Sequence, residues 1–411
     1  MRQTKLCFVI DRLALRSGGA ERVLIETANA LHDAGYSIEI VTHEQRGKPP
    51  FYPLRPGILR ANLRPANEQR GRIRRMIDRL RMKWHRSEWL PYGLRRLKWL
   101  SMHGGFKSRL GRHIDATQPD AVIAFLPPSV TALGLARFTH RPRLFASLHN
   151  VPSQDFDNPQ RWDPNPVDRS FRRAALDRYD AIGILLPEFQ DWFPEHLRAR
   201  LLVVPNAVQP VRSDLVRQAI RDNTVISVGR LAEVKQHRLL IEAWAYLKDD
   251  FPDWTCKIYG IGPMQEELSE LICKLGLTGH VSLMGDTREI EKVYLSASIL
   301  AHPAKFEGFG LVITEALAHG VPVVGFEDCS GFNFIVKDGT SGLFVNGEGD
   351  RARNLSKVLA RLMCDPRRQE NLRAGGLREV ERFAPERILA LWKLAIHGPT
   401  EHAAAKFQGE D

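Results

Sequence analysis

Short apolar runs recur along the first half of the chain, and each ends in a glycine, a proline or a polar residue. After the first run, residues 17–21 form a glycine-rich turn, and apolar positions then recur with helical spacing until Gly35. Such runs are typical of buried strands of a parallel sheet, and the spacing between them is typical of an amphipathic helix. The predicted strands cover residues 6–10, 38–42, 121–125, 144–148, 181–185 and 201–204.

A turn-rich segment, residues 205–210, separates this series from a second one. The second series again alternates strands with helices, which predicts two doubly wound α/β halves joined by a linker. Because ligands bind beyond the carboxyl ends of parallel strands, we expect a cleft between the two halves. The predicted strands are 225–229, 256–259, 281–284, 299–302 and 321–325, and the helices 239–247, 264–275 and 311–318.

Composition agrees with two globular domains. A chain of 411 residues with 43% hydrophobic residues is long for one domain and ordinary in hydrophobicity. Five scattered cysteines without a CxxC pair argue for a reducing compartment and against a disulfide framework or a metal site. No apolar run approaches the roughly 18 residues of a membrane span. We therefore expect a cytoplasmic protein, and its net charge of +11 predicts an anionic partner.

The most specific segment is 306–320, in which a glycine-rich turn runs into an apolar helix. Glu307 lies in the turn, and Glu315 lies just over one turn into the predicted helix. The N–H groups at such a helix start are unpaired and carry partial positive charge, so they suit a phosphate. The two carboxylates can accept hydrogen bonds from two sets of hydroxyls on one ligand, for example a sugar and a ribose.

This segment resembles the E-x7-E signature of family 4 of the retaining glycosyltransferases, which have the GT-B fold of two Rossmann-like domains. The match runs from Glu-Gly-Phe-Gly-Leu through Glu-Ala-Leu-Ala-x-Gly-Val-Pro-Val-Val. The resemblance implies that Glu307 is a catalytic residue that holds sugar hydroxyls and that Glu315 holds the ribose. It also implies donor binding by Gly308, Phe309, Gly310, Leu311 and Val312.

A second motif, Gly-Arg-Leu followed by a lysine, places Arg230 and Lys235 near a strand end. In the family these cations hold the donor diphosphate, and the resemblance implies the same catalytic role here. Cations and helix N–H groups can stabilise the charge of the leaving nucleoside diphosphate, so we expect neither a metal nor another cofactor. Many members have glycine after the lysine, where this chain has Gln236. Gly262 would let the nucleotide lie against the backbone.

Two features of the first half also match the family. Gly18 and Gly19 open the first helix, and the resemblance implies that they approach the donor phosphate. His149 follows the strand 144–148, and the resemblance implies that it reaches the transferred sugar as a catalytic residue. The alternative for a lone histidine at a strand end is a structural role.

Two further patterns remain apart from this match. Residues 155–157 spell DxD, the metal-binding motif of the other major glycosyltransferase fold, but their proline-flanked loop in an α/β context does not match, so we interpret the motif as a coincidence. Phe332 and Phe334 replace usual loop residues of the family, and Phe334 stands where glutamate is common. Their effect on donor or acceptor preference stays open.

Residues 70–112 form a basic arm in which Asp78 and Glu88 are the only acids. A basic helix with an apolar stripe and nearby tryptophans predicts an interfacial element for an anionic membrane surface. The alternatives are a core-packed helix with a solvated basic face and nucleic-acid binding, which no recognised motif supports. The stripe consists of Ile73, Met76, Ile77, Leu80 and Trp84.

These observations together predict a retaining, metal-independent glycosyltransferase. It would move a sugar from a nucleotide-sugar to a lipid-linked or membrane-proximal glycan, such as a polyprenyl-diphosphate-linked acceptor, in lipopolysaccharide or exopolysaccharide biosynthesis. We expect it to be peripheral on the cytoplasmic face of the inner membrane and expect no nucleic-acid partner. The alternatives are a non-catalytic GT-B membrane assembly factor and a GT-B sugar-nucleotide 2-epimerase.

The expected domain boundaries follow from the turn-rich linker and the last strands. Residues 1–205 form the expected acceptor-binding domain, which includes the basic arm. Residues 206–385 form the expected nucleotide-sugar-binding domain, and residues 386–411 a C-terminal helix and a disordered tail.

Overall fold

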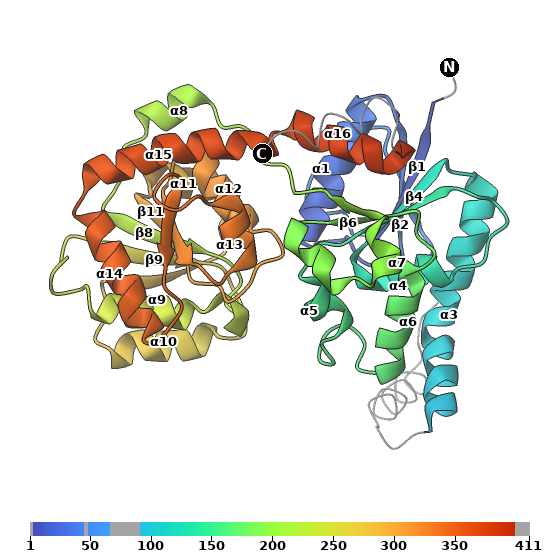
Figure 1. Ribbon diagram of the computed structural model, residues 1–411, viewed down its shortest axis with the longest axis horizontal. Helices are drawn as coiled ribbons and strands as arrows, with labels where there is room; N and C mark the ends of the chain where they lie inside the picture. Colours follow the sequence, from blue (N-terminus) through green and yellow to red (C-terminus); the bar gives the residue numbers. More distant parts are fainter. Residues whose placement is uncertain (1–2, 45–47, 66–90, 399–411) are drawn as a thin grey trace. The chain divides into compact units, whose positions relative to one another are not determined.

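The computed structural model describes residues 3–44, 48–65 and 91–398 (Figure 1). The chain divides into two compact units. The first consists of the described residues up to Val204 together with those from Leu389 to Gly398, and the second of Pro205–Ile388. Among the described residues, no helix is both long enough and apolar enough to cross a bilayer.

The first unit, as far as it is described, is built on a seven-stranded sheet in the order β3-β2-β1-β4-β5-β6-β7. All its strand pairs are parallel, and Leu6 of β1 pairs with Ile38 of β2 on one side and Ala121 of β4 on the other. Successive strands therefore run outward from the centre in both directions, and the order reverses between β1 and β4. The strands are β1 (Lys5–Val9), β2 (Ser37–Thr42), β3 (Leu59–Asn62), β4 (Ala121–Phe125), β5 (Arg143–Ser147), β6 (Ala181–Ile184) and β7 (Leu201–Val203).

Helices connect these strands and cover the sheet. The α1 helix follows the glycine-rich turn, and its Val23, Ile25, Ala28 and Leu31 are buried as the helical spacing predicts. The first turns of α3 lie at the periphery of the unit (Figure 1). The helices are α1 (Gly19–Asp33), α3 (Tyr92–Thr117), α4 (Leu126–Leu135), α5 (Pro152–Phe156), α6 (Pro166–Leu176), η1 (Pro187–Trp192) and α7 (Glu195–Arg198).

The last helix, α16 (Pro385–His397), begins in the second unit and packs its later residues on the first. Trp392 is 3% exposed and contacts two strand aromatics, Phe125 at 5.8 Å and Phe145 at 5.3 Å between ring centroids. Arg143 donates a hydrogen bond to the carbonyl of Ala395 at 2.9 Å. The end of the chain thus completes the core of the first unit.

The second unit holds, in its described residues, a six-stranded parallel sheet in the order β10-β9-β8-β11-β12-β13. Its order reverses between β8 and β11. The core of this unit includes Trp244, Cys256, Ile258 and Phe326, all fully buried. The strands are β8 (Thr224–Val228), β9 (Thr255–Tyr259), β10 (Val281–Gly285), β11 (Ile299–His302), β12 (Val323–Phe326) and β13 (Gly342–Val345).

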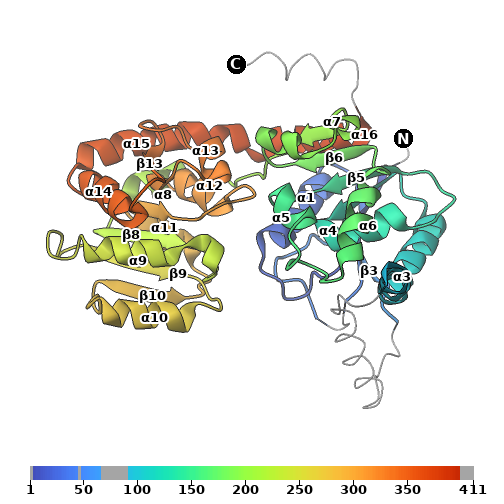
Figure 2. The same cartoon turned by 60° about the horizontal axis from the view of Figure 1, so that its bottom comes forward.

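Helix α9 contacts both α10 and α14, while α12 packs against α13 and α15. In Figure 2, α10 and α15 lie on opposite sides of this unit. The helices are α8 (Ser213–Gln218), η2 (Glu233–Lys235), α9 (His237–Ala245), α10 (Gln265–Lys274), α11 (Ile290–Ser296), α12 (Leu311–Ala318), α13 (Ser330–Ile335), α14 (Arg351–Met363), α15 (Pro366–Val380) and η3 (Glu381–Phe383).

The strands predicted from apolar runs are present within two residues at each end, and α12 begins and ends as predicted. The predicted apolar stripe of the basic arm, Ile73 to Trp84, lies outside the described residues, as does the tail from residue 399. The part of the arm that is described belongs to α3, where Trp99 and Phe106 are buried and Tyr92 is exposed.

Candidate functional site

The second unit brings the predicted phosphate-binding cations and Glu307 to one end of its sheet. Neighbouring strands β8 and β11 lead in opposite directions, toward β9 and toward β12. Arg230 and Lys235 follow β8, and Glu307 follows β11. These three residues therefore lie at the edge and reversal point where open α/β sheets bind their ligands.

Lys235 and Glu307 form an ion pair, in which Nζ of Lys235 donates to Oε1 of Glu307. Their side chains are mostly buried, at 21% and 14% exposure. Nε2 of His302, the last residue of β11, lies 3.1 Å from the same oxygen, although its approach is not aligned as a hydrogen bond. Two nitrogen groups thus meet a single carboxylate oxygen.

These neighbours keep the carboxylate of Glu307 charged. Burial by itself raises its pKa, but the ammonium of Lys235 and the imidazole of His302 outweigh burial and lower the pKa to about 2. Glu307 is therefore an anion at neutral pH, able to accept hydrogen bonds from hydroxyl groups and unsuited to act as an acid.

The glycine turn that carries Glu307 depends on Gly310. Its φ of 106° and ψ of 58° lie in the left-handed region, and a Cβ there would lie 2.6 Å from Cδ1 of Ile313. The α12 helix then starts at Leu311 without a side-chain cap. The N–H groups of its first turn, including those of Leu311 and Val312, keep the positive end of the helix dipole open to an anion.

Phe309 was predicted at the donor site, and the structure places its ring in an aromatic cluster. The ring is 3% exposed and contacts Phe383 edge-on at 5.2 Å, with Phe334 at 6.5 Å. The guanidinium of Arg382 lies 4.8 Å from the Phe334 ring and donates to the Phe334 carbonyl. Phe334, found where the family commonly has glutamate, therefore supports the turn that contains Gly308 by packing.

Glu315 is held from a neighbouring helix. The hydroxyl of Tyr294, a fully buried residue of α11, donates to Oε2 of Glu315 at 2.9 Å. His319 contacts the main-chain carbonyl of Glu315 through Nδ1 at 2.7 Å, and its ring lies 5.0 Å from that of Tyr294. Glu315, the residue predicted to bind the ribose, is thus held in a fixed orientation.

Gly262 also has a packing role within the unit. A Cβ at Gly262 would lie 2.2 Å from the carbonyl oxygen of Leu231, so this glycine lets the turn after β9 approach the backbone beside Arg230. Gln236 adopts the left-handed conformation, with φ of 49° and ψ of 36°. This backbone accounts for the glycine that many family members have after the lysine.

In the first unit, Gly18 and Gly19 open α1 at the carboxyl edge of the sheet. The loop before them is held by Glu44, a 7% exposed residue whose Oε2 accepts from the N–H groups of Leu13 and Ala14 at 2.9 and 2.8 Å. The side chain of Glu21 turns back toward Gly18, and burial raises its pKa. Glu21 is therefore part of the loop-to-helix junction.

His149 lies two residues beyond β5, in a stack of rings. Its imidazole lies parallel to Phe125 at 4.9 Å, and its Nε2 is 2.9 Å from the hydroxyl of Ser147. Burial lowers its pKa to about 3, so the imidazole is neutral at pH 7. Because Trp392 stacks on Phe125 as well, the C-terminal helix supports the position of His149.

A pocket of about 560 Å³ opens beside these elements in the first unit. Asp11 and Arg12 enter it after β1 and Leu126 after β4, so the pocket lies at the reversal point of this sheet. Leu126 and Trp162 hold unfavourable positive φ values of 67° and 66° at its wall. Other lining residues are Arg16, Glu21, His43, Trp99, Met102, His103, Phe106 and Lys107.

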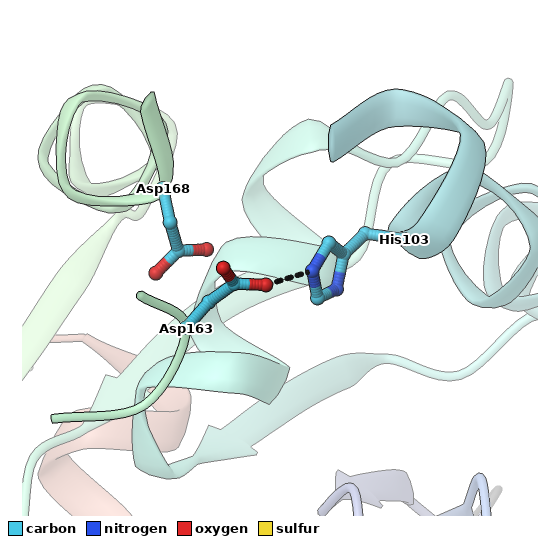
Figure 3. Close-up of side chains that lie close together, drawn as sticks. All are labelled: His103, Asp163 and Asp168. Atoms are coloured by element: carbon cyan, nitrogen blue, oxygen red, sulfur yellow. Dashed lines mark hydrogen bonds and ion pairs between the residues drawn. The ribbon is translucent and has the colours of Figure 1, made fainter. Parts of the chain in front are cut away.

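Three residues of the kinds that bind metal ions lie close together in the wall of this pocket: His103, Asp163 and Asp168 (Figure 3). Nε2 of His103 is 2.7 Å from Asp163, and Asp168 accepts from the indole of Trp99 at 2.7 Å and from the guanidinium of Arg172. Arg172 is 1% exposed and neutralises Asp168. The cluster is therefore an internally hydrogen-bonded network that joins α3 to α6.

The two acids of the DxD sequence have separate partners. Asp155 accepts from the indole of Trp162 at 3.0 Å, and Asp157 accepts from the indole of Trp192 at 2.8 Å. Arg161 pairs with the first acid at 3.0 Å, and Arg173 pairs with the second. Both acids fix local structure.

The structure adds three residues to the predicted set: His302, Tyr294 and Glu44. His302 ends a predicted strand, and a polar residue at that place is a signal that the sequence contained. Tyr294 and Glu44 act on partners 21 and 30 residues away along the chain, so only the folded arrangement connects them.

The structure is a two-unit α/β protein in which Lys235, Glu307 and the start of α12 meet at one edge of the second sheet. Residues 216–378 match the family described as Glycosyl transferases group 1, and residues 17–212 match the family described as Glycosyltransferase Family 4. The chain belongs to these glycosyltransferases and is a glycosyltransferase with the GT-B fold.

Several relatives share this assignment. The chain is 24% identical over 381 residues to an uncharacterized glycosyltransferase of Haemophilus influenzae, covering 92% of this chain and 96% of the relative. It is 32% identical to the exopolysaccharide phosphotransferase SCO2592 of Streptomyces coelicolor over 52% of this chain, which spans 23% of that protein. A Campylobacter jejuni protein, N-acetylgalactosamine-N,N'-diacetylbacillosaminyl-diphospho-undecaprenol 4-alpha-N-acetylgalactosaminyltransferase, is 35% identical over 33% of this chain and 36% of its own length.

Solved structures share the fold. TarM of S. aureus, whose mutant was solved with Fondaparinux, alpha-GlcNAc-glycerol and UDP, superposes with a TM-score of 0.74 at 12% identity, covering 96% of this chain and 100% of TarM. Sucrose-phosphate synthase of Thermosynechococcus elongatus gives 0.71 at 19% identity, covering 95% and 98%.

Proposed function

We propose that this glycosyltransferase moves a sugar from a nucleotide-sugar to a glycan acceptor, with retention at the anomeric carbon and without a metal. The observation that carries the proposal is the Lys235–Glu307 pair at the reversal point between β8 and β11, beside the open start of α12. It places a cation, a carboxylate and helix N–H groups in one small region. A nucleotide-sugar presents the matching diphosphate and hydroxyl groups.

The proposed chemistry is heterolysis of the bond between the sugar and its diphosphate. Arg230, Lys235 and the first N–H groups of α12 would stabilise the negative charge that develops on the leaving diphosphate. Glu307 would accept hydrogen bonds from sugar hydroxyls, and Glu315 from the ribose. The acceptor hydroxyl would attack from the side of the leaving group, and a donor phosphate oxygen would take its proton, so no protein nucleophile is needed.

The pocket of the first unit is the proposed acceptor site. Its aromatic walls and its mixture of carboxylates, cations and imidazoles suit a carbohydrate, whose rings have apolar faces and whose edges carry hydroxyls. Support for a lipid-linked glycan comes from the Campylobacter relative, whose name describes a diphospho-undecaprenol acceptor. The Streptomyces relative supports a role in surface polysaccharide synthesis, since its name describes exopolysaccharide.

The α3 helix is the proposed contact with an anionic membrane surface. Leu94 and Leu97 of its first turns are 52% and 65% exposed, and Tyr92 is 62% exposed. From Tyr92 to Ile114 the helix contains six lysines and arginines and no acid. Exposed apolar side chains beside a run of basic residues are typical of interfacial helices. The proposed location is the cytoplasmic face of the inner membrane.

The test is a binding and hydrolysis screen of the full chain against a panel of nucleotide-sugars, with a chelator present. We expect one nucleotide-sugar to raise the melting temperature and to release its nucleoside diphosphate slowly. Lys235→Ala should fold normally and lower kcat by about 100-fold, since it removes one preorganised cation. Lys274→Ala, an exposed lysine on α10, is the matched control.

The outcomes separate the proposal from its alternatives. Activity that disappears with the chelator and returns with a divalent cation would contradict the metal-independent mechanism. Full activity of Lys235→Ala would refute the role of this lysine. A folded wild-type chain that binds vesicles but no nucleotide would identify a non-catalytic assembly factor, and an epimerised nucleotide-sugar in the absence of acceptor would identify an epimerase.

A further inference from the structure

Among the three residues that meet at Oε1 of Glu307, namely Lys235, His302 and Glu307 itself, His302 is the least exposed. It ends β11 and is 2% exposed, and its Nε2 lies 3.1 Å from Oε1 of Glu307. In the register of the sheet it lies beside Gly325 of β12. None of the roles assigned above to the phosphate and sugar contacts involves this residue.

The surroundings of His302 leave its ring little freedom. Phe332 of α13 is fully buried, and its ring lies parallel to the imidazole, with 6.4 Å between centroids and 5° between planes. The Phe332 ring occupies the space over Gly325, where a Cβ would lie 2.6 Å from it, and it also contacts Phe344 at 5.6 Å. Phe332 thus fills a position whose role the sequence left open, and it supports the histidine.

Lys235 differs from His302 in the flexibility of its side chain and in its proposed role. Its ammonium is carried on a flexible four-carbon chain that is 21% exposed, and the proposed function gives it to the donor diphosphate. A diphosphate that attracts the ammonium weakens the contact between Lys235 and Oε1 of Glu307. A buried carboxylate that loses an ion-pair partner is costly and poorly oriented unless another group holds it.

We infer that His302 is a positioning residue that holds Oε1 of Glu307 while Lys235 engages the donor diphosphate, leaving Oε2 of Glu307 to the sugar hydroxyls. This inference rests on the proposed function, because it assigns the sugar contact to Glu307. An imidazole with its proton on Nε2 needs only a small rotation to align with Oε1 at the observed distance. Residues behind a ligand-binding group fix its orientation in the same way around metal sites.

The inference predicts a separation between two parts of the donor. The nucleoside diphosphate is held by Arg230, Lys235 and the start of α12, none of which needs His302. The sugar is held by Glu307, which does. Loss of His302 should therefore leave binding of the nucleoside diphosphate intact and weaken catalysis and discrimination between donor sugars.

The experiment compares His302→Leu, His302→Gln and Phe332→Leu in the full-length chain. Calorimetric affinity for the nucleoside diphosphate should stay within about threefold of wild type in all three. With the nucleotide-sugar, His302→Leu should lose about 10- to 100-fold in kcat, the range seen when supporting partners of ligand-binding groups are removed. His302→Gln, whose amide can still donate a hydrogen bond, should keep most of the wild-type kcat. The ratio of activities with two epimeric donor sugars should fall toward one only in His302→Leu and Phe332→Leu.

Phe326→Leu is the matched control, because Phe326 is an equally buried phenylalanine of the same unit that belongs to its main core. It should lower stability without changing sugar preference. A folded His302→Leu with wild-type kcat and sugar preference would overturn the inference. If His302→Leu does not fold, the inference is tested with Phe332→Leu, and an unchanged sugar preference in that variant would overturn it. A wild-type chain that binds no nucleoside diphosphate would instead refute the proposed function, on which the inference depends.

Discussion

Gln236 shows how a single backbone angle can explain a side-chain preference. The residue joins η2 to α9 with a φ of 49°, a conformation that costs a residue with a Cβ roughly 1 kcal/mol. Its main chain is well bonded, since its N–H donates to Glu233 and its carbonyl accepts from Leu239. Its side-chain oxygen is buried and has no hydrogen-bond partner among the described residues. The chain therefore keeps a strained residue next to Lys235.

Replacing Gln236 by glycine should relieve this strain. We expect Gln236→Gly to leave the free energy of unfolding unchanged or to raise it by up to about 1 kcal/mol, because the relief competes with the greater flexibility of unfolded glycine. Gln236→Val should lower it, since a β-branched side chain tolerates positive φ poorly. Urea unfolding of the three proteins measures the difference, and a glycine variant less stable than wild type would contradict the explanation.

At this scale the sequence was informative where a motif is continuous. Glu307, Gly310 and Glu315 lie in one uninterrupted segment, so their shared location was predictable. The contacts of His302 with Phe332 and of Tyr294 with Glu315 join different helices and strands, and no local spacing encodes them. The close approach of Gly262 to the Leu231 carbonyl is likewise a contact that only the folded arrangement shows.

Among the secondary-structure elements, α12 connects the local sequence most directly to the site. Its start depends on a left-handed residue, Gly310, followed at once by apolar residues that are buried on one side. Strands with continuous apolar runs were equally predictable. Two edge strands were missed: β3, with the sequence Leu-Arg-Ala-Asn, is half exposed and too polar to resemble a buried strand, and β13 is only four residues long. The edge strands β7 and β10 were predicted.

Gly310→Ala should disturb α12 and the turn before it. We expect a loss of at least about 1 kcal/mol in the free energy of unfolding from the positive φ, and more from the contact with Ile313. We also expect a loss of activity, because the turn carries Glu307. The matched control is Gly35→Ala, because Gly35 has a φ of 93° and no described residue lies within 4 Å of the Cβ that the substitution adds.

Both variants share the conformational penalty, and only one of them affects the site. Chemical unfolding and donor hydrolysis are measured on each. Equal activity of the two variants would contradict the role given to the turn before α12.

For the molecule as a whole, each unit contains a buried histidine that stays neutral when folded. Burial lowers the pKa of His149 to about 3, and burial together with the charges of Lys235 and His302 lowers the pKa of His237 to about 3. In the unfolded chain both titrate near pH 6.5. The unfolded state therefore binds more protons than the folded state between about pH 3 and 6.5, and stability falls as the pH falls through that window.

This linkage predicts a loss of stability in mild acid. Between pH 6 and 5 each histidine should contribute a slope of up to about 1.4 kcal/mol per pH unit. Replacing His237 by leucine should lower the number of protons taken up on unfolding by about one, and so reduce the slope of stability against pH, whatever its effect on stability at pH 8. Unfolding by urea at pH 5, 6, 7 and 8 tests this, and an unchanged slope in His237→Leu would show that this imidazole is protonated in the folded chain.

The route of the chain through its two units has a consequence for synthesis on the ribosome. The second unit is an insertion in the described chain: residues before Pro205 and the later residues of α16 both belong to the first unit. Trp392 can cover Phe125 and Phe145 only after the whole second unit has been synthesised. At roughly 5 to 20 residues per second, about ten seconds or more separate the translation of Val204 from that of Trp392. The inserted unit can complete its own core first. During that time the first unit still exposes the aromatic surface that Trp392 later covers, and this surface is where a chaperone would bind.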